Sequence, residues 1–358
     1  MNVLEHERTS MHAPHSRQRS GLLACSLILV CIVSLNGQLA AQTPGRVSVD
    51  RGPAVEEAVF FSFDDRAIPW RHNLALTPQT AKKHPANPVL RRGPEGAPDH
   101  GHAILYGSVL YLDGKFRMWY LGMFETAIKS GQAPGWWRPM CYAESDDGIH
   151  WKRPDLGLFS FPPGSGNKDN NIVIGKAHRD WMKSAKPDPV HPAVFKDENP
   201  TCPPDAKYKA ILRSRGPHGL LALKSPDGIH WSLIRDEPVI TKGYFDSQNL
   251  AFWDPVAKEY VDYHRTFVNR VRSIMTCRST DFVNWTKPVL LNYTDVTPDQ
   301  HLYTNAIRPY DRAPHIRVGF PTRYKPQGSQ VAPIFMSSRD GLHFRRGRRE
   351  GDLARMGH

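Results

Sequence analysis

The chain has 358 residues, a formal net charge of +12 and five cysteines. Part of the positive charge lies in the first segment and part in the last stretch, FRRGRREGDLARMGH. No basic stripe interleaved with aromatics runs through the body, so no nucleic-acid partner is predicted. The cysteines show no C-x-x-C spacing and predict neither a disulfide framework nor a zinc site.

The first segment predicts export. A basic, polar start is followed by the short apolar run GLLACSLILVCIVSLNG and the small residues QLAAQ, the pattern of a secretory signal cleaved near Ala41. We therefore expect a signal peptide over residues 1–41 and a periplasmic or extracellular protein. The alternative is an uncleaved signal segment, which is the one membrane contact that the sequence predicts. Residues 42–97 are expected to join the folded body as an N-terminal segment.

One motif occurs four times along the body. YAESDDGIHW recurs as LKSPDGIHW, CRSTDFVNW and MSSRDGLHF, with the motif aspartates at Asp147, Asp227, Asp281 and Asp340. Three short β-like runs precede each copy, and another run follows each of the first three directly after its Trp. Repeats of this size built from short strands are typical of propeller blades. We therefore predict an all-β chain whose residues 98–344 form a β-propeller of four-stranded blades, about four of which are present.

The two ends of this repeat array do not fit a complete ring. Residues 345–358 show no apolar alternation for a last strand and are expected to form a basic, irregular tail. The early run AVFFSFDD is expected to pair with a last blade, although one strand cannot make a blade. Two interpretations remain: a four-bladed ring or a shortened version of a longer protein, and we favour the second because an unpaired blade edge promotes aggregation.

The composition of the motif indicates a structural turn and not an active site. Its Ser and Asp side chains accept hydrogen bonds from backbone N–H groups in tight turns, and Gly148, Gly228 and Gly341 supply a left-handed position. The aromatic residue that closes each copy is expected to pack between blades. Phe282 replaces the glycine in the third copy, so we expect that turn to differ.

The repeated S-x-D-(F/G)-(V/I)-x-W pattern resembles the five-bladed propeller superfamily of glycoside hydrolase families 32, 43 and 68. It is also similar, one residue shorter, to the Asp-box of sialidases. The stretches FFSFDDRAI, KHPANPVL, YGSVLY, FRMWY and FPTRY look like a secreted bacterial family-32-like group. The resemblance implies a five-bladed type of propeller with carboxylates in a central funnel. The N-D-P-N-G, R-D-P and E-C signatures are absent, and HPANP is a faint echo of the first.

Aspartates at the starts of the inner strands are the candidate catalytic residues: Asp99, Asp188, Asp246 and Asp299. At equivalent places of radially repeated blades they would converge at one end of the channel. Such convergence would supply the two carboxyl groups that glycoside cleavage needs. The alternative is that Asp simply favours the turns that precede strands.

Polar and aromatic residues beside these aspartates are the candidate substrate-binding groups: His102, His191, Gln248, Asn249, Tyr303 and Asn305. Amides, imidazoles and an aromatic ring are the groups that a sugar site needs. The same histidines and aspartates would also suit a metal ion, with calcium favoured by oxygen donors. Their spacing is not diagnostic, so we predict no cofactor and keep calcium as the alternative.

These observations predict a secreted, glycoside hydrolase-like protein that acts on a glycosidic bond through carboxylates at the channel mouth. Carbohydrate is the predicted partner. A non-catalytic carbohydrate-binding propeller and an inactive shortened product are the alternatives. Neither the sugar nor the oligomeric state follows from the sequence.

Overall fold

The computed structural model describes residues 59–64, 66–68, 70, 72–73, 82–126, 135–175, 186–293 and 300–346. These residues belong to one compact unit, Val59–His358, and the other unit, Met1–Ala58, lies outside the described residues together with the predicted signal peptide. No helix in the described part of the chain is long and apolar enough to cross a membrane. The structure of the described residues is all-β, as predicted.

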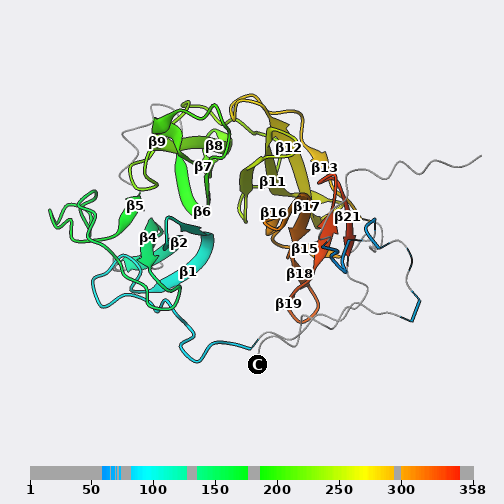
Figure 1. Ribbon diagram of the computed structural model, residues 1–358. Helices are drawn as coiled ribbons and strands as arrows, with labels where there is room; N and C mark the ends of the chain where they lie inside the picture. Colours follow the sequence, from blue (N-terminus) through cyan, green and yellow to red (C-terminus); the bar gives the residue numbers. More distant parts are fainter. Residues whose placement is uncertain are drawn as a thin grey trace, which may run out of the picture. The chain divides into compact units, whose positions relative to one another are not determined.

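The first blade begins with a tight hairpin (Figure 1). Asp113 and Gly114 both have positive φ angles, 54° and 76°, which suits the two-residue turn that the sequence predicts between its first two strands. The order across the sheet is β1-β2-β4-β5, with β3 paired to the end of β2. The strands are β1 (His102–Leu112), β2 (Lys115–Thr126), β3 (Gly135–Trp137), β4 (Met140–Ser145) and β5 (Ile172–Ile174).

The second and third blades are four-stranded antiparallel sheets in chain order. The second contains β6 (Pro187–Lys196), β7 (Tyr208–Arg215), β8 (His218–Ser225) and β9 (Ser232–Leu233), with a short 3₁₀ helix, η2 (Pro204–Ala206), between β6 and β7. The third contains β10 (Leu250–Asp254), β11 (Glu259–Val268), β12 (Val271–Ser279) and β13 (Val289–Leu290).

The fourth blade is completed by a strand from the third repeat. Its own strands are β16 (Ile307–Tyr310), β17 (Ala313–Gly319), β20 (Met336–Ser338) and β21 (His343–Arg346), and β14 (Asn292–Tyr293) pairs in parallel with β21. A separate three-stranded sheet consists of β15 (His301–Leu302), β18 (Thr322–Lys325) and β19 (Gln330–Pro333). Each described repeat thus forms a blade-type sheet, which agrees with the predicted fold class.

Two predictions about the fourth strands are wrong. In the first blade the strand is Ile172–Ile174, and the stretch after Trp151 contributes one isolated bridge, between Glu144 and Lys152. In the fourth blade β21 extends through Arg346 into the segment that was expected to be irregular. Outer strands need only backbone hydrogen bonds and one covered face. A four-residue strand with a single buried apolar residue, Phe344, shows no apolar alternation in the sequence.

Two of the hydrophobic core clusters lie between successive blades, and a smaller one lies within the first repeat. One cluster joins Trp119 and Tyr142 of the first blade to Val194 and Tyr208 of the second. Another combines buried residues of the second, third and fourth blades, among them Phe195, Ile211, Ala251, Tyr263, Ile307 and Phe344. A sheet that packs against a neighbour on each face buries long runs of consecutive residues, as seen for residues 220–223 of β8.

The repeated motif is a hydrogen-bonded turn in all four copies. In the first, the Ser145 Oγ accepts a hydrogen bond of 2.9 Å from the backbone N–H of Gly148. The Asp147 Oδ1 accepts from the N–H groups of Ile149 and His150, at 2.8 and 2.7 Å. The other copies repeat this pattern. The motif therefore uses its polar atoms to hold its own backbone, which confirms the interpretation as a structural turn.

The third copy keeps the same turn, contrary to expectation. Phe282 adopts a left-handed φ of 67° and donates its N–H to the Ser279 Oγ at 2.9 Å, in the place of the glycine of the other copies. Its ring is fully buried, 5.5 Å from the Phe195 ring and 5.1 Å from the Tyr260 ring. Burial of a whole phenyl ring offsets the backbone strain.

The second, third and fourth motif turns each contact a side chain from the second strand of the preceding blade. Trp119 on β2 donates its indole N–H to the carbonyl oxygen of Gly228, and the Tyr263 hydroxyl on β11 donates to that of Gly341, at 2.7 and 2.8 Å. Lys209 on β7 lies 5.8 Å from the centre of the Phe282 ring. The motif turns are therefore the joints between neighbouring blades.

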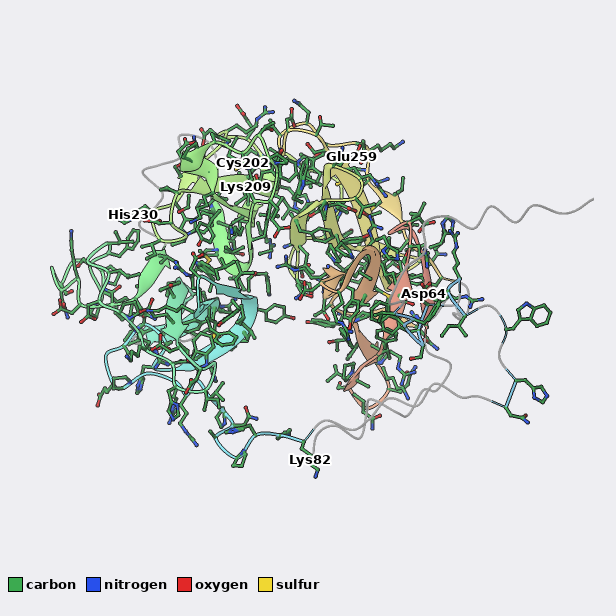
Figure 2. The ribbon with its side chains drawn as sticks, viewed as in Figure 1. Asp64, Lys82, Cys202, Lys209, His230 and Glu259 are labelled. Carbon is green, nitrogen blue, oxygen red and sulfur yellow. The ribbon has the colours of Figure 1, made fainter. Side chains whose placement is uncertain are left out.

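The joint between the second and third blades also holds a buried ion pair. Lys209 contacts Asp197, and the Tyr260 hydroxyl donates a hydrogen bond of 2.7 Å to the same carboxylate. The Cys202 Sγ lies 3.4 Å from the Lys209 Nζ (Figure 2). A buried charge needs such partners because an unpaired one is costly in a low-dielectric interior.

The described residues of the early run, 59–64, contact the fourth blade but form no strand with it, contrary to expectation. The Arg339 Nε donates a hydrogen bond of 2.9 Å to Asp64, and the Ser337 hydroxyl donates to the Phe63 carbonyl oxygen. The Phe61 ring packs edge-on against Tyr310, with ring centres 5.0 Å apart. These contacts join the start of the described chain to its last blade.

Candidate functional site

Irregular pairing in the first strands of two neighbouring blades places polar groups together. The register of β1 shifts between Ile104 and Ser108, and that of β6 shifts between Asp188 and Ala193. Such shifts turn side chains out of the regular alternation. They bring the ring of Tyr106 within 4.4 Å of the ring of His191, centre to centre.

Charged and aromatic residues of the second, third and fourth repeats lie near these two rings. We call the whole group the arginine–tyrosine cluster; it consists of Tyr106, Asp188, His191, Arg213, Asp246, Arg265, Arg272 and Tyr303. The charges of Asp188, Arg213, Asp246 and Arg265 all act on His191. The structure therefore brings together two of the predicted aspartates, Asp188 and Asp246, and two predicted binding residues, His191 and Tyr303.

His191 is a neutral group within this cluster. Burial lowers the pKa of its imidazole to about 4; the neighbouring aspartates raise this pKa by smaller amounts, and the neighbouring arginines lower it. Its Nδ1 atom is buried and has no hydrogen-bond partner among the residues that the structure describes. A neutral imidazole carries one N–H donor and one acceptor, so His191 retains hydrogen-bonding capacity for a ligand.

The two aspartates of the cluster differ in exposure. The Asp188 side chain is 5% exposed and lies 2.8 Å from the Arg215 Nε and 3.6 Å from the Arg213 Nη1. The Asp246 side chain is 50% exposed and pairs with the buried guanidinium of Arg265. Partial burial would raise the pKa of Asp246, but the hydrogen bond and charge of Arg265 outweigh it and lower the pKa. Asp246 is therefore an accessible, ionised carboxylate.

Guanidinium groups stack over aromatic rings at the edge of the cluster. The Cζ atoms of Arg265 and Arg272 lie 5.4 and 5.1 Å from the centre of the Tyr303 ring, and both lie 5.4 Å from that of Phe267. Arg272 also lies 5.0 Å from the Tyr324 ring centre. Stacking of this kind holds planar charged groups in fixed orientations.

Asp99 does not take the place that the sequence analysis gave it. Its side chain is fully buried, accepts a hydrogen bond of 2.8 Å from the Tyr120 hydroxyl and pairs with Arg153 at 2.7 Å. All of these partners belong to the first repeat. Asp99 is therefore an internal anchor of the first blade and offers no surface to a ligand, because its carboxylate already neutralises a neighbouring arginine.

Two of the predicted binding amides are also buried. Asn249 is 0% exposed and donates to the carbonyl oxygens of Phe245 and Ser247, and Asn305 is 1% exposed. Asn305 donates to Gln248 and Tyr263 carbonyl oxygens, while the Gln248 Oε1 accepts from the Asn305 N–H. Irregular backbone before a strand leaves carbonyl oxygens without strand partners, and the side-chain amides of Asn249 and Asn305 donate hydrogen bonds to them.

The two remaining predicted residues are not among those that form the arginine–tyrosine cluster. His102 is exposed at the first position of β1. Asp299 lies outside the described residues.

Sequence reasoning missed Tyr106 and the arginines of the cluster. Arg213, Arg265 and Arg272 lie inside or at the start of strands, whereas the search concentrated on residues that precede strands. The available signal was the presence of arginine within otherwise apolar strands, since arginine is seldom buried unless it is paired.

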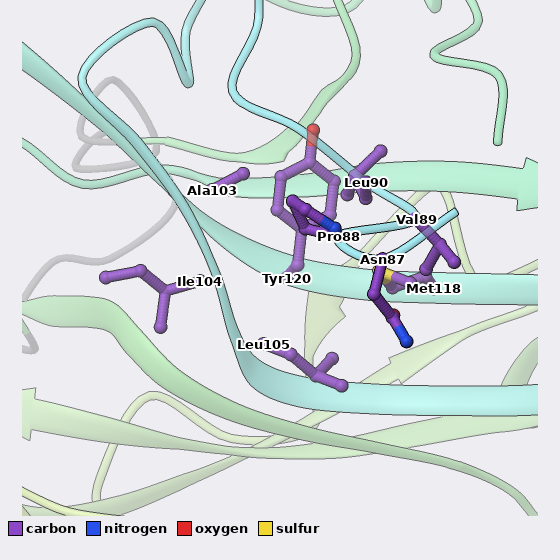
Figure 3. A pocket seen from close by; sticks show the side chains of 9 residues that line it. All are labelled: Asn87, Pro88, Val89, Leu90, Ala103, Ile104, Leu105, Met118 and Tyr120. Carbon is purple, nitrogen blue, oxygen red and sulfur yellow. The ribbon is translucent and has the colours of Figure 1, made fainter. Parts of the chain in front are cut away.

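A small apolar hollow lies elsewhere on the first blade, beneath the HPANP stretch (Figure 3). Its volume is about 200 Å³. It is lined by Asn87, Pro88, Val89, Leu90, Ala103, Ile104, Leu105, Met118 and Tyr120. This lining has few polar groups to orient a sugar, so the hollow is a weaker candidate site than the arginine–tyrosine cluster.

One buried group has metal-ligand side chains: Asp262, His264 and Cys277. Both ring nitrogens of His264 are engaged, the Nδ1 with Asp262 and the Nε2 with the Lys242 carbonyl oxygen at 2.9 Å. Burial raises the pKa of Asp262 and of Cys277, which favours the protonated forms that do not bind metals. The sulfur and nitrogen donors do not suit calcium. We describe this group as a hydrogen-bonded part of the core.

Neither a protein-family model nor a curated protein matches the chain. Solved structures do resemble it. An N-acetylgalactosamine deacetylase from F. plautii has a TM-score of 0.40 and 11% identity, and the match covers 64% of each chain. A family 117 glycoside hydrolase from Zobellia galactanivorans has a TM-score of 0.47 and 14% identity, with 72% of each chain covered. A fructofuranosidase from Schwanniomyces occidentalis has a TM-score of 0.45 and 15% identity, covering 72% of this chain and 48% of that one.

Proposed function

We propose that this protein binds a carbohydrate at the arginine–tyrosine cluster. The proposal is supported by one combination of groups: the aromatic ring of Tyr303, the unpartnered Nδ1 of His191 and the accessible carboxylate of Asp246. Sugars are recognised by an aromatic face that covers their apolar side and by a few fixed polar groups that bind their hydroxyls. The predicted signal peptide adds an exported setting, where polysaccharides are accessible.

The test is calorimetric titration of the full-length protein with a panel of soluble polysaccharides. Tyr303→Ala removes the ring and is expected to weaken binding about three- to tenfold, the usual contribution of an aromatic contact. Tyr111→Ala is the matched control, because Tyr111 is 61% exposed near the hairpin of the first blade. Equal affinities of the two variants for every polysaccharide would contradict the proposal.

Hydrolysis of a glycosidic bond is the second candidate function. It is favoured by the ionised, half-exposed Asp246 in the same cluster as His191. Glycoside cleavage needs an ionised carboxylate and a proton donor. His191 is protonated only near or below its pKa of about 4, so hydrolysis that uses it as the donor would be confined to acidic solution.

Release of reducing ends from a bound polysaccharide tests this second function. Asp246→Asn is expected to lower the rate by about 10²- to 10⁴-fold while the polysaccharide still binds. Asp205→Asn is the control, since Asp205 is an exposed carboxylate paired with Lys224. Binding without release of reducing ends in acidic or neutral solution would leave a carbohydrate-binding propeller without hydrolase activity.

A further inference from the structure

We infer that the carbohydrate bound by the arginine–tyrosine cluster carries negative charge, as a carboxylate or a sulfate ester on the sugar. This inference rests on the proposed function and names the substrate class of the same site. It starts from Arg265 and Arg272, whose guanidinium groups lie over the same two rings, Phe267 and Tyr303. Two positive charges are thus held close to one another on a shared aromatic support.

The charges around these rings do not balance. Arg265 pairs with Asp246, and Arg213 and Arg215 both lie beside Asp188. The polar side-chain partner of Arg272 is the His301 Nδ1, at 3.2 Å. Among the described residues no carboxylate forms an ion pair with Arg272. Among the described residues of the cluster, three guanidinium groups therefore stand beside two carboxylates, and a ligand with negative charge would relieve their mutual repulsion.

The geometry also suits an oxyanion. A guanidinium presents its N–H groups as a planar fork that matches the oxygens of a carboxylate or sulfate. Three rings restrict the Arg272 side chain, because the ring centres of Phe267, Tyr303 and Tyr324 lie within 5.4 Å of its Cζ. Little side-chain freedom is then lost when the anion binds, which favours affinity.

The experiment compares charged and neutral polymers with the full-length protein at one ionic strength. Polygalacturonate is measured against its methyl ester, and dextran sulfate against dextran. We expect at least one charged polymer to bind about tenfold or more tightly than its neutral counterpart, as for a charge-assisted hydrogen bond. The pair with the larger difference identifies the anion as a carboxylate or a sulfate.

Arg272→Gln should reduce that preference about tenfold, whereas Arg235→Gln should leave it unchanged. Arg235 is an exposed arginine paired with Glu237 on the second blade, so the two substitutions remove the same charge. If Arg272→Gln does not fold, the wild-type protein is tested by competition instead. We then expect free galacturonate to displace the bound charged polymer and galactose not to displace it.

The outcomes separate this inference from the function on which it rests. Equal binding of charged and neutral polymers, or equal loss in the two arginine variants, overturns the anionic substrate and leaves carbohydrate binding standing. Failure of every polymer to bind overturns the proposed function itself. Binding of a single-stranded oligonucleotide with the same Arg272 dependence, and with greater affinity than any polysaccharide, overturns both.

Discussion

The indole Nε1 of Trp119 donates a hydrogen bond of 2.7 Å to the carbonyl oxygen of Gly228, which lies 109 residues later in the chain. The bond joins β2 of the first blade to the motif turn of the second. A side chain at Gly228 would meet this indole, because a Cβ there would lie 2.6 Å from the Trp119 ring. Gly228 therefore meets two requirements at once: a φ of 81° and a close approach between blades.

Two glycine substitutions separate these requirements. Gly114→Ala faces a positive φ but no atom within 4 Å, so we expect a loss of about 1–2 kcal/mol in the free energy of unfolding. Gly228→Ala adds the clash with Trp119 and should cost about 1–3 kcal/mol more. Urea unfolding of both variants measures the difference. Equal losses would mean that Trp119 moves aside without cost.

At position 282 we expect glycine to give a more stable protein than alanine, which is the reverse of their usual order. Removal of the buried Phe282 ring should cost about 3–5 kcal/mol in the free energy of unfolding. Because φ is 67°, Phe282→Ala keeps the left-handed strain and Phe282→Gly removes it. We expect the glycine variant to be about 1 kcal/mol more stable than the alanine variant in urea unfolding. A more stable alanine variant would show that the turn changes conformation when the ring is lost.

The Lys209–Asp197 ion pair should be far more sensitive than an exposed one. Its side chains are 6% and 0% exposed, whereas those of Lys224 and Asp205 are 32% and 60% exposed. Asp197→Asn leaves a buried lysine charge unpaired and should cost about 3–5 kcal/mol. Asp205→Asn should cost less than about 1 kcal/mol. Thermal unfolding of the two variants makes the comparison, and similar melting temperatures would contradict it.

Acid should weaken the motif turns. Burial alone would raise the pKa of Asp227, but hydrogen bonds from the backbone and side chain of His230 and from the Ile229 N–H outweigh it and lower the pKa to about 2. The unfolded value is 3.8, so the stabilisation is fully present above that pH and is lost as the pH falls through about 2.

Asp227→Asn tests this pH dependence. The variant should be less stable than the wild type near neutral pH, and the gap in the free energy of unfolding should shrink between about pH 4 and 2. Asp146→Asn is the control, because the Asp146 side chain is 75% exposed. A gap that stays constant with pH would assign the loss to something other than titration of Asp227.

The blade repeat could be read from the sequence because its determinants are local. Ser145, Asp147 and Gly148 form hydrogen bonds to one another within four residues, so four similar copies of the motif predict four similar turns. The fourth strand of the first blade could not be read, because it follows Trp151 only after a long excursion to Ile172. Phe282 was misjudged because the burial that stabilises its strained backbone comes from the preceding blade.

Part of the candidate site follows from the sequence. The search for acids before inner strands identified Asp188 and Asp246, whose charges both act on His191. It gave the same weight to Asp99, whose burial depends on Arg153 and cannot be inferred from its own neighbours in the chain. Arg265 and Arg272 were overlooked because their meeting over Tyr303 is set by strand pairing and not by sequence spacing.

The pairing of Arg339 with Asp64 links residues that are 275 positions apart. During synthesis Asp64, Phe61 and Phe63 leave the ribosome first. Their partners on the fourth blade are synthesised later. At about 5–20 residues per second, the wait on the ribosome is about 14–55 s. During that interval the two phenylalanine rings lack their partners on the fourth blade and expose apolar surface, which favours binding by a chaperone.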